Sequence, residues 1–182
     1  NYLRSVILDV DKLNINSSVK EVVENSDIII LAIPSPFLEN ELIKVKSILK
    51  NKIVFSALKG VVPESHLIVS EHLNKFYDIA LSKIGIITGP CHAEEVALEK
   101  LSYLTVACES DKIGKDMKMS LESKNIKVKL SKDTMGVEYA AMLKNVYAIV
   151  AGIAHGLGYG DNFQSVLISN SVREMKRFVN DI

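Results

Sequence analysis

Short apolar segments and longer amphipathic segments alternate along the first two-thirds of the chain. The apolar segments, such as Asp-Ile-Ile-Ile-Leu-Ala-Ile at 27–33, have the length and the β-branched side chains of buried strands. We predict strands at residues 27–33, 52–58, 84–88, 103–108 and 126–130. Between them we predict helices at residues 18–24, 37–49, 65–73, 93–100 and 112–122. This alternation is typical of a parallel sheet with crossover helices, as in nucleotide-binding domains.

The pattern changes after residue 131. Residues 137–154 are apolar nearly all round a helix, and Asp133 or Thr134 is placed to cap it. Glycines at 156, 158 and 160 end this helix, and a second helix is predicted at 162–178. The glycine spacing differs from the G-x-G-x-x-G dinucleotide motif, which follows a strand. We therefore predict an α/β domain over 1–131 and an all-helical part over 132–182.

Lys144 is the only side chain with a full charge between residues 139 and 160. Because an all-apolar helix belongs in a protein interior, we expect Lys144 to lie in or beside a core. Its helical neighbours are mostly small, which leaves space for a ligand, and a desolvated ammonium gives up its proton more easily. Two other interpretations stay open: a lysine whose stem lies on apolar surface while its head reaches water, and a buried charge that sets the register of a non-catalytic helical assembly module.

Composition narrows the class of protein. The 182 residues carry 22 basic and 22 acidic side chains, so nothing indicates nucleic acid or an anionic membrane as a partner. Two cysteines and four histidines give neither a disulfide framework nor a metal-ligand spacing, and we predict no metal site. We expect a cytoplasmic protein without membrane insertion, because no sufficiently long uncharged run or signal peptide is present. The chain starts without methionine, and we expect it to be a fragment.

Ligands of open α/β sheets bind beyond the carboxyl ends of the strands, so the turns after the predicted strands are candidate sites. Phe37 follows one strand, where its ring could lie against a cofactor or, equally well by spacing, pack in the core. Lys59 and Gly60 follow the next, where the lysine could reach a phosphate, although a solvated loop lysine is commoner. Residues 88–95 form a strand-to-helix turn whose helical amides could attract an anion, with Glu94 and Glu95 as alternative helix caps.

Several motifs in order resemble those of the NAD(P)-dependent glycerol-3-phosphate dehydrogenase family, of the bacterial type. They are Leu58-Lys59-Gly60, Gly89-Pro90-Cys91-His92-Ala93-Glu94-Glu95-Val96-Ala97, Gly136-Val137-Glu138, Leu143-Lys144-Asn145-Val146 and Gly156-Leu157-Gly158-Tyr159-Gly160-Asp161-Asn162. The resemblance implies an incomplete Rossmann-like sheet followed by part of an all-helical substrate domain. It also implies NAD or NADP as cofactor and a phosphorylated small-molecule substrate, in a protein that could be a homodimer.

The resemblance also implies roles for single residues. Lys144 is similar to the catalytic lysine that protonates the ketone oxygen. The implied substrate contacts are Lys59, Gly89, Cys91, Lys144 and Asn145. The implied cofactor contacts are Phe37, Lys59 and Ala93.

The implied reaction interconverts dihydroxyacetone phosphate and sn-glycerol 3-phosphate and supplies glycerophospholipid synthesis. Cys91 departs from the family, which usually has serine or threonine there, and so do Asn170 and Ser171. The glycine-rich cofactor loop would precede Asn1, and an aspartate and an Arg-Asn pair of the substrate site would follow Ile182, so we expect the fragment alone to be inactive. A related two-domain dehydrogenase acting on a 3-hydroxy acid or sugar acid is the nearest alternative.

Overall fold

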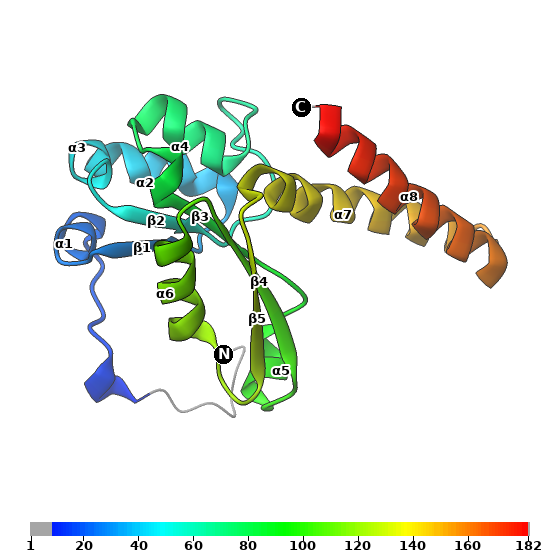
Figure 1. The fold of residues 1–182 in the computed structure, drawn as a ribbon, viewed down its shortest axis with the longest axis horizontal. Coiled ribbons are helices and arrows are strands. Elements are labelled where there is room, and N and C mark those ends of the chain that lie inside the picture. Colours follow the sequence, from blue (N-terminus) through cyan, green and yellow to red (C-terminus); the bar gives the residue numbers. More distant parts are fainter. Residues whose placement is uncertain (1–8, 182) are drawn as a thin grey trace.

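The structure is a computed structural model that describes residues 9–181 (Figure 1). Its sheet contains the five strands β1 (Ile28–Leu31), β2 (Ile53–Ser56), β3 (Ile84–Thr88), β4 (Ser102–Cys108) and β5 (Ile126–Ser131), side by side in that order. The strand predictions and the α/β class are therefore confirmed, with the first two strands shorter than predicted.

The direction of one strand differs from the prediction of a parallel sheet. β1, β2 and β3 are parallel, but β4 is antiparallel to β3, and β5 is parallel to β4. A parallel return needs a crossover of a dozen or more residues, usually with a full helix. The only helix between β3 and β4 is α5 (Ala93–Ala97), after which Glu99 adopts a left-handed φ of 56°. The chain therefore turns back at the same edge of the sheet.

Helices cover both faces of the sheet. Alternate side chains of its strands point to opposite faces, and apolar side chains on each face form a core. One face packs against α1 (Val19–Glu24), α2 (Leu38–Leu42), α3 (Lys46–Leu49) and α4 (Val69–Tyr77), and its core includes Val54, Leu73 and Ile84. The other face carries α6 (Asp111–Leu121), with Phe55 and Met117 in a second core. Single-turn 3-10 helices occupy Val10–Lys12, Ser35–Phe37, Ile43–Val45 and Leu81–Lys83.

Each predicted helix has a counterpart in the structure, but the bounds differ. The predicted helix at 37–49 is divided into α2 and α3 by a 3-10 turn. The predicted helix at 65–73 begins only at Val69, because Val61 and Ile68 pair in an isolated β-bridge that holds the intervening residues in a turn. α5 ends at Ala97, three residues earlier than predicted, at the left-handed Glu99.

The helical part is a hairpin of α7 (Thr134–Gly156) and α8 (Asp161–Asp181). Asp133 caps α7, since its Oδ1 accepts a hydrogen bond of 2.8 Å from the Gly136 amide. The first half of α7 packs along β3, and its second half projects beyond the sheet beside α8 (Figure 1). The predicted change from α/β to helical structure near residue 131 falls between β5 and α7.

Much of the hairpin surface is apolar and exposed, which contradicts the expectation that α7 lies in an interior. The exposed side chains of α7 include Val146, Ile149, Val150 and Ile153. By length and composition alone, α7 is long and apolar enough to cross a membrane. In its second turn, α7 carries a buried, hydrogen-bonded carboxylate, Glu138.

Candidate functional site

Three of the predicted turns lie at one edge of the sheet. Because β1, β2 and β3 are parallel, their carboxyl ends lie at the same edge. A hydrogen bond of 2.9 Å from the Ala57 amide, just beyond β2, to the Leu31 carbonyl joins the ends of β1 and β2 there. The segments that follow these strands carry Phe37, Lys59 and Gly89, respectively. This edge is where α/β proteins bind ligands.

Phe37 is 60% exposed at the end of the 3-10 turn that follows β1. The alternative in which this ring belongs to the core is wrong, because the next residue, Leu38, takes the core position with no exposed surface. The aromatic face of Phe37 is therefore available to a ligand.

Lys59 is exposed, and Gly60 beside it has a φ of 118° with no atom within 4 Å of where a Cβ would stand. A bare backbone with a positive φ beside a lysine permits close approach of a ligand. Within residues 9–181 the Lys59 ammonium has no ion-pair partner, so its charge is free to attract an anion.

Gly89 is required by packing. Its φ is 145°, and a Cβ would lie 2.3 Å from the Tyr103 carbonyl oxygen on β4. Cys91 is half-buried with a free thiol, and Ala93 is the exposed first residue of α5. Glu94 and Glu95 lie in the first turn of this helix, whose N-cap, His92, accepts no side-chain hydrogen bond.

Lys144 is exposed, and so is Asn145, so Lys144 does not lie inside a core. Val137 and Ala140 precede Lys144 on one side of the helix, at spacings of seven and four residues, and both are partly buried. Lys144 thus lies where the partly buried part of this side ends. The interpretation as a buried, register-setting charge is wrong for the described chain, and the snorkelling interpretation agrees with the exposure.

Glu138 is a buried carboxylate that the sequence analysis did not assign. It lies on α7, is 3% exposed and accepts hydrogen bonds from three donors of α4. The Val69 amide donates to Oε1 at 2.8 Å, and the Ser70 amide and hydroxyl donate to Oε2 at 3.2 and 2.5 Å. Burial raises the pKa of Glu138, while the hydrogen bonds from Ser70 and Val69 act in the opposite direction. Two sequence signals were present: a charged residue in a largely apolar helix, and the place of Glu138 in the motif Gly136-Val137-Glu138.

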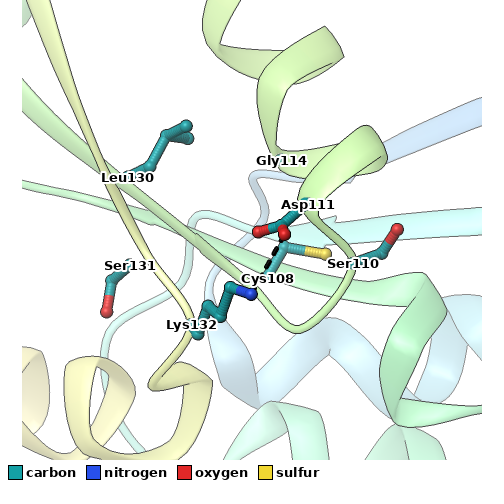
Figure 2. Close-up of a pocket in the computed structure, with 7 residues that line it drawn as sticks. All are labelled: Cys108, Ser110, Asp111, Gly114, Leu130, Ser131 and Lys132. Carbon is teal, nitrogen blue, oxygen red and sulfur yellow. Dashed lines mark hydrogen bonds and ion pairs between the residues drawn. The ribbon is translucent and has the colours of Figure 1, made fainter.

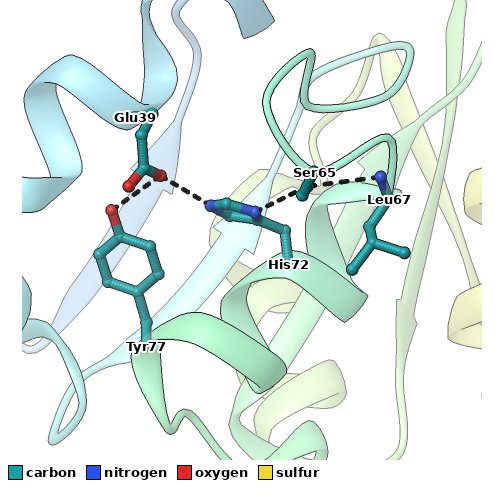
Figure 3. A network of polar contacts seen from close by, with 5 residues as sticks. All are labelled: Glu39, Ser65, Leu67, His72 and Tyr77. Carbon is teal, nitrogen blue, oxygen red and sulfur yellow. Dashed lines mark hydrogen bonds and ion pairs between the residues drawn. The ribbon is translucent and has the colours of Figure 1, made fainter.

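A second polar network joins α2 to α4 (Figure 3). Both ring nitrogens of His72 form hydrogen bonds. Nδ1 bonds with Ser65 Oγ at 2.9 Å, and Nε2 bonds with Glu39 Oε2 at 2.8 Å. The Tyr77 hydroxyl donates to the same Glu39 oxygen at 3.0 Å, and burial together with Glu39 raises the pKa of Tyr77. Because His72 is buried and both of its nitrogens are engaged, we assign this network to packing rather than to catalysis.

A cavity of about 180 Å³ lies at the other edge of the sheet (Figure 2). It is lined by the ends of β4 and β5 and the start of α6, and the Lys132 ammonium lies 3.0 Å from Asp111 Oδ2. Since β4 is antiparallel to β3, these strand ends point away from the edge that carries Lys59 and Gly89. This cavity is therefore separate from the candidate site.

The fold and the carboxyl edge define an α/β protein of the dinucleotide-binding kind that continues into a helical segment. The family model described as the N-terminus of NAD-dependent glycerol-3-phosphate dehydrogenase matches residues 1–114, and the one described as its C-terminus matches residues 133–182. The chain belongs to the NAD-dependent glycerol-3-phosphate dehydrogenase family.

Curated relatives agree with this assignment. The chain is 37% identical over 155 residues to a glycerol-3-phosphate dehydrogenase [NAD(P)+] of Pseudomonas fluorescens, covering 85% of this chain and 45% of the relative. It is 32% identical over 172 residues to one of Lactobacillus delbrueckii, covering 92% and 51%. The chain thus spans about half the length of the curated relatives it matches.

A solved structure has the same fold. The glycerol-3-phosphate dehydrogenase of Saccharomyces cerevisiae superposes with a TM-score of 0.78 at 28% identity, covering 90% of this chain and 49% of that one.

Proposed function

We propose that this chain belongs to an enzyme that interconverts dihydroxyacetone phosphate and sn-glycerol 3-phosphate with NAD or NADP. The observation that carries the proposal is the match of both family models, in order, to a single chain. The exposed groups at the carboxyl edge support it. They combine the Phe37 ring, the backbone of Gly60 and the Lys59 ammonium, which has no ion-pair partner within residues 9–181.

In this proposal Lys144 protonates the ketone oxygen during reduction and takes the proton back in the reverse reaction. Lys59, whose ammonium is exposed beside Gly60, attracts the phosphorylated substrate. Gly89, Cys91 and Asn145 are the further substrate contacts. When bound, the nicotinamide cofactor supplies the hydride that reaches the carbonyl carbon.

In this proposal the cofactor contacts are Phe37, Lys59 and Ala93, which are all exposed, and Lys59 lies near the nicotinamide. No G-x-G-x-x-G motif occurs in the 182 residues, so these residues do not supply the usual pyrophosphate cradle. We therefore propose that the 182-residue chain alone is inactive, and turnover by it would contradict this.

The cellular setting belongs to the same proposal. We place the enzyme in the cytoplasm, where it supplies glycerophospholipid synthesis, and two free cysteines are consistent with a reducing compartment. Assembly as a homodimer is part of the proposal.

The test is an assay of the full-length protein for oxidation of NADH and NADPH that depends on dihydroxyacetone phosphate. Lys144→Met should lower kcat by about 10²-fold or more, the usual contribution of a general acid. Lys176→Met, which removes an exposed lysine of α8, is the matched control and should leave kcat unchanged. Turnover of 3-hydroxy acids or sugar acids in place of dihydroxyacetone phosphate would favour the related dehydrogenase instead.

A further inference from the structure

The start of α4 depends on a side chain from α7. The first amides of a helix have no partner within the helix, and a polar N-cap residue usually supplies one. The N-cap of α4 is Ile68, which has no polar side chain. Glu138 takes its place, with both carboxylate oxygens accepting hydrogen bonds from Val69 and Ser70. A negative charge at this end of a helix is also favoured by the helix dipole.

The same α4 start is tied to the segment that carries Lys59 and Gly60. Val61, the next residue, pairs with Ile68 in a β-bridge. Within the turn between them, the Val62 amide donates to the Leu67 carbonyl at 2.8 Å, and the His66 amide donates to the Val62 carbonyl at 2.8 Å. This turn is therefore a short, hydrogen-bonded link between Lys59 and the Val69 and Ser70 amides, which donate hydrogen bonds to Glu138.

We propose that Glu138 is a positioning residue that fixes α7, and with it Lys144, relative to the segment of Lys59. The inference rests on the proposed function, in which both lysines serve one substrate. Lys144 lies six residues after Glu138, about 9 Å along the helix axis. Because side chains of α7 beyond Lys144 are largely exposed, the buried contacts that hold this helix on the α/β part lie on the Glu138 side of Lys144.

The geometry calls for a carboxylate. Each oxygen of Glu138 accepts a hydrogen bond from a backbone N–H, so in either orientation the amide NH₂ of Glu138→Gln would face one of these N–H groups and lose that bond. A neighbouring contact, from the Tyr139 hydroxyl to Glu71 Oε2 at 3.2 Å, is a single bond at a partly covered position and does not replace the three bonds of Glu138.

The experiment compares the full-length wild type with Glu138→Gln for reduction of dihydroxyacetone phosphate by NADH and by NADH deuterated at the transferred position. We expect kcat to fall about 10- to 100-fold, as for a misplacement of about 1 Å at the reacting centre. The deuterium isotope effect on kcat should rise, and the Kd for NADH should stay unchanged. Hydrogen exchange at the Val69 and Ser70 amides should become faster, which needs no cofactor to be observed.

A double-mutant cycle separates positioning from general damage. If Glu138 acts through Lys144, Glu138→Gln should cause no further loss in a Lys144→Met background. Asp133→Ala is the matched control, because it removes the cap of the same helix without touching α4. It should lower the Tm and leave kcat unchanged.

The outcomes are distinguishable. A folded Glu138→Gln protein with unchanged kcat and isotope effect, or additive losses in the cycle, would overturn this inference alone. Absence of wild-type turnover would overturn the proposed function and this inference together. Should Glu138→Gln fail to fold, Ser70→Ala removes only one of the three bonds and should lower kcat about threefold. An unchanged kcat in that variant would then contradict the proposal.

Discussion

Gly89 and Gly60 both have a positive φ, but only Gly89 is also confined by packing. A Cβ at Gly89 would overlap the Tyr103 carbonyl, whereas a Cβ at Gly60 would meet no atom. We expect Gly60→Ala to lower the free energy of unfolding by about 1 to 3 kcal/mol through backbone strain alone. Gly89→Ala should cost more, at least about 3 kcal/mol, because strain and overlap add.

Urea-induced unfolding of the two variants checks this prediction. Equal losses would show that the approach of Gly89 to β4 relaxes without a penalty. In that case a contact with substrate, rather than packing, would be the better reason for glycine at position 89.

The individual site residues could be predicted from the sequence to different degrees. The place of Phe37 and Lys59 after parallel strands follows from the alternation of segments, whereas the sequence left open whether the Phe37 ring is exposed or in the core. The exposure of Lys144 could not be predicted. An apolar pattern shows that a helix surface favours burial, but it does not show which segment covers that surface. Glu138 was missed because its partners lie 68 and 69 residues away along the chain.

At the scale of elements, the strands were easier to predict than their directions. A buried strand has the same composition in parallel and antiparallel pairs, so β4 gave no signal of its reversal. The decisive features were the early end of α5 at Ala97 and the left-handed conformation of Glu99, which a non-glycine residue seldom takes. Similarly, the predicted helix began at Ser65. In the structure Ser65 lies in the turn that precedes α4, and its hydroxyl forms a hydrogen bond with His72 of that helix.

The apolar surface of α7 leads to a prediction about this element. Ile149 is 65% exposed, whereas Ile79, after α4, has no exposed surface. Ile149→Ala should change the free energy of unfolding of the 182-residue chain by no more than about 0.5 kcal/mol. Ile79→Ala should lower it by about 2 to 5 kcal/mol, since it leaves a cavity in the core.

Denaturant titration of both variants at equal protein concentration is the measurement. A loss at Ile149 as large as that at Ile79 would mean that another surface covers this face in solution. The identical substitution at the two positions removes differences in side-chain chemistry.

For the molecule as a whole, burial is uneven. β2 and β3 lie inside the sheet between two cores, whereas most of α8 is exposed. Local unfolding requires less free energy where few apolar contacts are broken. We therefore expect amide hydrogen exchange in the 182-residue chain to be slowest in β2 and β3, and fastest among the helices in α8.

Hydrogen exchange followed by mass spectrometry at two protein concentrations checks this order. Protection of α8 equal to that of β3 would contradict the prediction. If such protection rose with concentration, a second copy of the chain would be its source.

The source of the α4 cap also bears on the time course of folding. Glu138 lies 61 residues after Tyr77, the last residue of α4, so a chain growing at about 5 to 20 residues per second completes α4 roughly 3 to 12 seconds before Glu138 is made. Until then the first amides of α4, next to the turn after Lys59, lack the carboxylate that caps them. The last step in forming this edge of the sheet is thus a long-range contact, and synthesis of α7 sets the earliest moment at which the nascent protein becomes fully ordered there.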